Sequence, residues 1–196
     1  DIVLMTHMHH DHSGGLTYVN DQGKLVSKYP NAKIIVNDVE WYEMRNPNDR
    51  TRGTYLRENW EPIQDQVTTF LEYINVIPEI QMIHTSGHSN GHSIILLKQG
   101  KDTMIHMGDL MLSHVHRNSL WVPAVDDYPM KSILAKEKWL RQAFENHYKF
   151  FFYHDQFFAV VEFDKDGKEF VDYVLRSRPP LIPFTDQQDR KPDFLG

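Results

Sequence analysis

The pattern of apolar and polar residues at the start of the chain indicates a buried strand that runs into a cluster of histidines. Residues 2–6 are apolar or β-prone, and His7, His9 and Asp11 follow at a spacing of two residues. Alternate side chains of an extended segment share a face, so these three are expected to point the same way. His12 comes directly afterwards, where two glycines permit a sharp turn. The pattern therefore predicts that several metal-ligating side chains gather at the end of this strand.

Apolar residues recur at helical spacing in four further segments. Residues 16–29 are predicted to form a short helix with a polar loop inside or beside it. Asp38 is expected to cap a second helix, and residues 55–71 show apolar positions near the spacing of a third. Residues 130–147 have the clearest amphipathic pattern, which predicts a long helix with one buried face.

Short apolar runs bounded by turn residues predict the strands. They lie at residues 32–36, 79–82, 92–98, 102–107, 149–153, 157–163 and 170–175. The last two form an apparent hairpin around residues 164–167, where an Asp and a Gly favour a tight turn. Strands mixed with helices place the chain in the α/β (α+β) class.

Length and composition fit one globular domain over residues 1–196, with a substantial core. The chain is 40% hydrophobic and 24% charged, and it has no apolar run long enough to cross a membrane. We therefore expect a single domain that does not act on a membrane.

Charge and cysteine content exclude several functions. The formal charge is −6, and two divalent ions would bring it to −6 + 4 = −2, which argues against a nucleic-acid partner. The sequence has no cysteine, so disulfides, thiolate catalysis and zinc-thiolate sites are excluded. A chain without cysteine fits a cytoplasmic enzyme, and this is the localisation that we expect.

The histidine cluster has an ordinary alternative, which is a His-rich surface loop or a purification tag. A tag is not preceded by a buried strand and followed by Ser13 and two glycines, as this cluster is. The spacing of His7, His9, Asp11 and His12 after a strand resembles the signature of the metallo-β-lactamase superfamily. The resemblance implies an αββα sandwich with a metal site at one edge of the two sheets. It also implies that the N-terminal strands of that fold are absent from this chain, because the signature begins here at residue 7.

The same resemblance extends along the chain to three more residues. His88 follows Gly87 in an element similar to the superfamily's third ligand loop, Asp109 ends a predicted strand, and His154 matches the last histidine. It implies seven ligands in two sets: His7, His9 and His88 on one metal, Asp11, His12 and His154 on the other, and Asp109 bridging both. His92 is expected to support this ligand shell.

Imidazole and carboxylate ligands suit zinc, and manganese, cobalt or iron also accept this set. Two ions that share a ligand would activate a bridging water, so that hydroxide attacks the substrate. Asp11 and Asp109 are the predicted catalytic residues, and Asp11 would also pass a proton to the leaving group.

Within the superfamily, residues 1 to about 185 are similar to YtnP-type quorum-quenching lactonases, near the methyl parathion hydrolase branch. This similarity implies a small-molecule substrate and, more closely, the opening of N-acyl homoserine lactone-type rings. Related lactonases carry a tyrosine three residues after the bridging aspartate, where this chain has Leu112. We therefore predict that His114 or His116 supplies the missing hydrogen bond and that Trp121 walls the substrate pocket.

Several alternatives remain open at this point. The runner-up is a phosphotriesterase or arylesterase of the same superfamily, followed by a glyoxalase II-type thioesterase and a mononuclear iron persulfide dioxygenase. A metal-binding scaffold without catalysis is disfavoured, because all seven ligand positions are intact. The sequence leaves a homodimer open as the oligomeric state.

Overall fold

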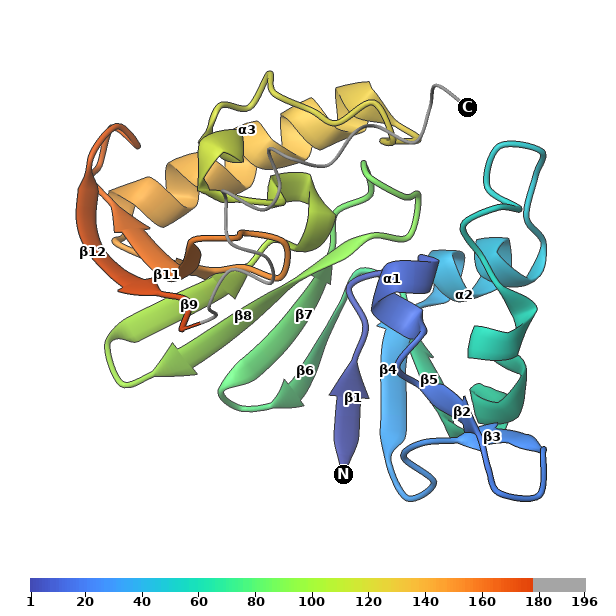
Figure 1. Ribbon diagram of the computed structural model, residues 1–196. Helices are drawn as coiled ribbons and strands as arrows, with labels where there is room; N and C mark the ends of the chain where they lie inside the picture. The colour runs from blue at the N-terminus through green and yellow to red at the C-terminus, as the bar shows by residue number, and fades with distance from the viewer. Residues whose placement is uncertain (178–196) are drawn as a thin grey trace, which may run out of the picture.

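Two β-sheets lie face to face in the computed structural model, which describes residues 1–177 (Figure 1). The smaller sheet is parallel and has the order β1-β4-β5. Its strands are β1 (Ile2–Leu4), β4 (Lys33–Asn37) and β5 (Val67–Phe70). The predicted first strand is thus a real one, and it pairs with a strand some thirty residues later, Ile2 opposite Lys33.

The larger sheet has seven strands in the order β12-β11-β10-β9-β8-β7-β6. They are β6 (Tyr73–Ile77), β7 (Ile80–His84), β8 (Ser93–Gln99), β9 (Asp102–His106), β10 (Lys149–Phe151), β11 (Phe158–Phe163) and β12 (Phe170–Leu175). All neighbours are antiparallel except β9 and β10, which a long crossover connects. That crossover contains the loop of residues 124–127, which lines a pocket.

Helices cover the outer faces of both sheets (Figure 1). The α-helices are α1 (His10–Ser13), α2 (Asp38–Arg45) and α3 (Pro129–Glu145). Short 3-10 helices are η1 (Arg57–Asn59), η2 (Glu61–Gln66), η3 (Gly108–Met111) and η4 (His114–Arg117). Within the described residues no helix combines the length and apolar character that a membrane span requires.

Apolar side chains fill three layers between these elements. Ile35 of the small sheet packs with Met82 and Ile95 of the large sheet, so the two sheets share a core. Trp139 of α3 packs on the far face of the large sheet, and Trp41 of α2 belongs to the core behind the small sheet. Burial of this apolar surface is the main stabilising contribution. The order helix, sheet, sheet, helix confirms the αββα sandwich inferred from the sequence.

The prediction of a helix at residues 16–29 is wrong. This segment is a hairpin of β2 (Thr17–Val19) and β3 (Leu25–Ser27). The polar loop expected inside or beside the helix is the hairpin's turn, in which Gly23 has φ +72° and Asn20 Oδ1 accepts the Lys24 N–H at 2.9 Å. β-Branched and aromatic residues on both sides of that turn favour strands over a helix.

The prediction of a helix at residues 55–71 is also wrong. The chain forms η1 and η2 and then enters β5, whose residues pair in parallel with β4 from Ile34–Val67 to Asn37–Phe70. Pro62 lies at the start of η2, and the β-branched run from Val67 to Thr69 prefers the sheet. Strand β6 was not predicted at all, although Ile74 and Val76 alternate with exposed residues along it.

Two helix boundaries also differ from the prediction. A helix begins at His10, earlier than the expected position near Leu16, so the extended segment ends at His9. Asn37, rather than Asp38, caps α2, and its Oδ1 accepts the Val39 N–H at 3.0 Å. The first difference matters for the site, because Asp11 and His12 project from a helical turn and not from a strand.

Candidate metal centre

Three buried histidines form the first group of donors. His7 and His9 come from the extended segment after β1, and His88 comes from the loop between β7 and β8. Nδ1 of His9 lies 3.0 Å from Nε2 of His88. The hydrogen bond from Ser13 Oγ to the His9 carbonyl, at 3.0 Å, helps to hold the turn that presents these rings.

A second group lies at the more open side of the first. Asp11 and His12 are on α1, Asp109 is on η3, and His154 follows β10. Nε2 of His12 is 3.3 Å from Nε2 of His154, and Oδ2 of Asp11 is 3.3 Å from the same His154 atom. All seven residues predicted as ligands therefore lie in these two groups, each of which could hold one metal ion.

The carboxylate of Asp109 lies between the two groups. Its Oδ2 is 3.4 Å from Nε2 of His88 and 3.9 Å from Nε2 of His7. Its Oδ1 is 3.2 Å from Nε2 of His12 and 3.4 Å from Nε2 of His154. One oxygen thus faces each group, which is the arrangement that a carboxylate bridging two ions requires.

The charges and unpaired atoms of this cluster fit divalent cations. Within the described residues, Nε2 of His7 and Oδ1 of Asp109 are buried and have no hydrogen-bond partner, which is costly unless another group, such as a cation, binds there. Burial lowers the pKa of His7 well below its usual value, and burial together with the nearby His88 lowers the pKa of His9 to about 3. Burial alone would raise the pKa of Asp109, but the imidazoles of His12 and His154 outweigh it and lower that pKa. The neutral imidazoles of His7 and His9 beside the ionised carboxylate of Asp109 are donors that zinc and its first-row neighbours prefer.

Buried neighbours orient the donor atoms. Nδ1 of His88 is 2.9 Å from Oδ1 of Asp126, which fixes the tautomer that leaves Nε2 free for a metal. Burial opposes protonation of His88, but Asp126 and Asp109 outweigh it and raise the pKa of His88. Nε2 of His92 accepts the backbone N–H of Asp109 at 3.2 Å, the supporting position expected for His92. Gly108 is required here, because its φ is +51° and a Cβ would lie 2.5 Å from that His92 nitrogen.

Glu40 joins the two ligand loops from behind, and no sequence pattern indicated this role. Its carboxylate is fully buried on α2 and accepts hydrogen bonds from Met8 N at 2.8 Å, Tyr55 Oη at 2.9 Å and Ser89 Oγ at 2.6 Å. Met8 lies between two ligands, Ser89 follows a third, and the ring of Tyr55 packs against His9 at 5.2 Å. Burial raises the pKa of Glu40, although all three donors oppose that shift. A buried carboxylate spaced far from the motif has no signal in a single sequence.

Tyr153 and Asp155 flank His154 and were not predicted either. The hydroxyl of Tyr153 donates to the Asp11 carbonyl at 2.9 Å, and its ring lies 4.8 Å from His12 and 4.7 Å from His154. Asp155 is buried and accepts the backbone N–H groups of Phe157 and Phe158, both at 2.9 Å. These contacts fix the turn that carries His154.

The histidines proposed as substrate donors have other partners. Nδ1 of His114 lies 2.6 Å from Oδ2 of Asp155, and Nδ1 of His116 lies 2.9 Å from Oγ of Ser113. Trp121 is exposed, and its carbonyl accepts a hydrogen bond from Lys136 at 2.6 Å. In the described part of the chain, the pocket beside the metal centre is lined by other residues and by none of these three. Through Asp155, His114 instead contacts the turn that carries His154.

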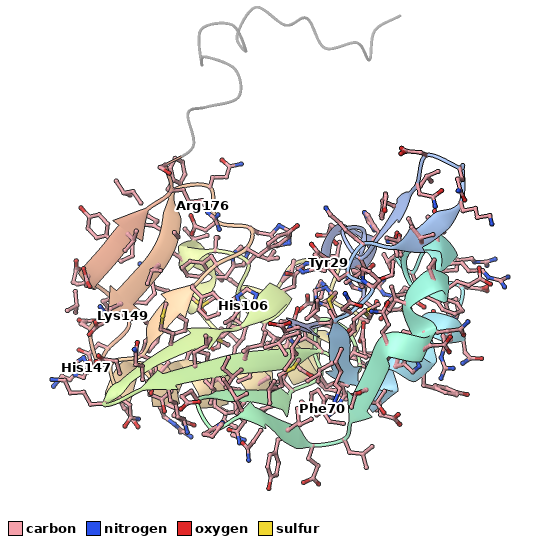
Figure 2. All side chains as sticks on the ribbon, turned by 90° about the horizontal axis from the view of Figure 1, so that it is seen from below. Tyr29, Phe70, His106, His147, Lys149 and Arg176 are labelled. Atoms are coloured by element: carbon pink, nitrogen blue, oxygen red, sulfur yellow. The ribbon has the colours of Figure 1, made fainter. Side chains whose placement is uncertain are left out.

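Two further histidines lie outside the cluster. His106 on β9 is stacked on Phe151, and its Nδ1 is 2.9 Å from the Phe151 carbonyl, as suits a residue of the sheet core. His147 was expected to end the long helix, but α3 ends at Glu145 and His147 follows with φ +56°. Its side chain lies at the outer edge of the molecule, far from His106 (Figure 2).

A pocket of about 450 Å³ opens beside both groups of donors. Metal-centre residues form its floor, and two surface loops, residues 50–54 and 124–127, form its walls. The lining residues are His9, His10, Asp11, Arg50, Thr54, His88, Asp109, Ala124, Val125 and Asp127. This volume is in the range of sites for small organic ligands.

The layered sheets and the two donor groups at their edge are those of an α/β protein with a candidate metal site. Residues 1–153 match the family described as the metallo-beta-lactamase superfamily. The match covers well over half of the chain, and the chain belongs to this superfamily.

Comparison with individual proteins gives the following similarities. A probable metal-dependent hydrolase from Staphylococcus aureus has a TM-score of 0.86 at 39% identity, over 92% of this chain and 64% of that one. A hydroxyacylglutathione hydrolase from Prochlorococcus marinus is 28% identical over 57% of this chain and 36% of its own length. An N-acyl homoserine lactonase from Bacillus cereus is 28% identical over 53% of this chain and 35% of its own length. The chain thus matches about a third of each of these two relatives.

Proposed function

We propose that this chain forms the metal-binding part of a hydrolase that holds two divalent ions, zinc by preference, and opens lactone rings of the N-acyl homoserine lactone type. The position of Asp109 carries the proposal, because its two oxygens face two separate groups of donors. A single-ion site needs no carboxylate between two such groups. His7, His9 and His88 would hold one ion, and Asp11, His12 and His154 would hold the other.

Bound ions would supply an activated water and would polarise the substrate carbonyl. The residues of the chain provide the rest of the chemistry. Asp11 lines the pocket, and its side chain is 40% exposed, so its carboxylate can take a proton and deliver it to the leaving alkoxide. Burial lowers the pKa of His7 and of His9, so both imidazoles are neutral, as metal ligands must be.

The lactone assignment is supported by the similarity to N-acyl homoserine lactonase and by the apolar part of the pocket wall. Ala124 and Val125 offer a surface for an acyl chain. A phosphotriester is the second candidate, because Leu112 replaces the tyrosine of related lactonases and His114 is engaged by Asp155. A phosphoryl oxygen that rests on a metal depends less on such a donor.

Metal analysis combined with a substrate panel tests this proposal. The full chain, purified without chelator, is expected to contain two ions and to open N-hexanoyl homoserine lactone faster than it hydrolyses paraoxon or lactoylglutathione. Fast paraoxon hydrolysis without lactone opening would favour the second candidate. One iron per chain with persulfide oxidation would contradict both.

A further inference from the structure

An ion pair between Arg50 and Asp127 connects the two walls of the pocket. Nε of Arg50 lies 2.5 Å from Oδ1 of Asp127, and an Nη2 hydrogen bond to the Asp126 carbonyl, at 2.9 Å, holds the guanidinium in place. The Arg50 side chain is 56% exposed, whereas that of Asp127 is only 11% exposed. Both residues line the pocket, so a substrate that enters meets this pair.

The pair is attached firmly to the metal centre. The backbone N–H of Asp127 donates to the His88 carbonyl at 3.0 Å, and the neighbouring Asp126 holds the His88 ring. On the other wall, the carbonyl of Thr54 accepts the backbone N–H of His10 at 2.9 Å. Arg50 and Asp127 therefore connect two walls, each of which is bonded to a ligand loop.

Asp127 neutralises the charge of Arg50 where a substrate would contact the pocket wall. Arg50 is the one arginine or lysine among the residues that line the pocket in the described chain. Proteins bind carboxylates and phosphates through guanidinium or ammonium groups that are free to form charged hydrogen bonds. Here that charge is opposed by Asp127, and the neighbouring Ala124 and Val125 are apolar.

We propose that the Arg50–Asp127 pair is a specificity device that makes the pocket select neutral substrates and reject those with a carboxylate beyond the reacting carbonyl. This inference rests on the proposed function and deepens it by defining the substrate class. A neutral acyl chain can lie on Ala124 and Val125, while the remaining N–H groups of Arg50 donate to an uncharged carbonyl. The carboxylates of a glutathione thioester would find no free cation on this wall.

The experiment compares two esters of matched length, neutral 4-nitrophenyl butyrate and anionic 4-nitrophenyl hemisuccinate, on the metal-replete chain. The quantity measured is the ratio of kcat/KM for the anionic ester to that for the neutral ester. Asp127→Asn removes the opposing charge, so this ratio should rise about ten-fold at low salt. The rise should disappear at high salt, because screening weakens exposed charges, whereas a purely structural disturbance would not depend on salt.

Arg50→Gln provides the opposite control, because it leaves Asp127 unopposed and should lower the same ratio. The double variant Arg50→Gln with Asp127→Asn should return it toward the wild-type value. A ratio that stays constant in all three variants would overturn the proposal, and so would equal changes at low and high salt. If the ratio responds as expected but N-hexanoyl homoserine lactone is not opened, the selectivity stands and the lactonase proposal fails.

Discussion

At the scale of single residues, carboxylates organise this site, and they have different functions. Asp109 faces both donor groups, Asp126 orients His88, and Glu40 holds the two ligand loops together. Only the first of these three was predicted, because its position after a strand matched a family pattern. The other two act through contacts between segments that are 15 or more residues apart, and such contacts leave no local spacing to detect.

Replacement of Asp109 by asparagine tests the bridging position. The amide keeps the shape of the side chain but removes the negative charge between the two groups. We expect weaker binding of the ion held by His12 and His154, and a loss of turnover of about a hundred-fold or more. Metal content and kcat check this, with the exposed Asp65→Asn as a matched control. Wild-type activity in Asp109→Asn would rule out the bridge.

Replacement of Glu40 by glutamine tests the three hydrogen bonds through which Glu40 connects the ligand loops. The amide nitrogen cannot accept a hydrogen bond, so at least one of the three donors loses its partner, at a cost of about 1–3 kcal/mol. Metal affinity should fall about 10–100-fold, as for other residues that position ligands. Tyr55→Phe removes a single donor and should have a smaller effect on stability and on metal affinity. Metal affinity is measured by competition with a chelator. Equal affinity in the wild type and in Glu40→Gln would show that the hydrogen bonds of Glu40 are not needed to position the ligands.

At the scale of elements, segments with a strong periodic pattern were predicted well, whereas two of the four predicted helices were wrong. The long helix and most strands of the large sheet have strong periodic patterns, and both are present. Residues 16–29 and 55–71 carry apolar residues at spacings that suit either helix or strand. Their state is decided by pairing across the molecule, as with Val67 opposite Ile34 on β4. The pocket walls could not be predicted, because irregular loops have no periodicity.

Lys136 on α3 gives a prediction at this scale. Its side chain is buried, its Nζ donates to the carbonyls of Asn118 and Trp121, and burial lowers its pKa from the usual 10.5 to about 8. The unfolded chain therefore binds more protons than the folded chain between about pH 8 and 10.5. The free energy of unfolding should rise with pH across this window.

Lys136→Met should flatten that rise, because the titrating group is gone. Urea denaturation at about pH 7.5, 9 and 10.5 spans the window and measures the difference between the variant and the wild type, so that contributions of other groups cancel. The exposed Lys101→Met is the matched control and should retain the wild-type slope. The same slope in all three proteins would mean that Lys136 titrates normally.

At the scale of the whole molecule, the metal centre joins the two sheets. The segment that follows the small sheet's first strand supplies His7, His9, Asp11 and His12, and the large sheet's loops supply the remaining three ligands. Each group of donors contains residues from both sides. Bound ions would therefore add links between segments that the shared core and hydrogen bonds such as that from Tyr153 to the Asp11 carbonyl already hold together.

Removal of metal should lower the thermal stability of the whole chain. An ion present at a thousand times its Kd contributes about 4 kcal/mol, which corresponds to a Tm difference of roughly 8–16 °C for a chain of this size. Calorimetry before and after dialysis against chelator, with re-addition of zinc as the control, measures this difference. An unchanged Tm after verified metal loss would show that the ions do not link the sheets.

The loop of residues 124–127 also has a consequence for how such a protein can diverge. Ala124 and Val125 face the pocket, whereas the next residue, Asp126, is fixed by its bond to His88. Inherited changes at the first two positions can therefore reshape the substrate range and leave the metal chemistry intact. A change at the third would disturb that chemistry whatever the substrate. Within one short loop, two positions can therefore change with the substrate, while the third must stay the same for the reaction to be preserved.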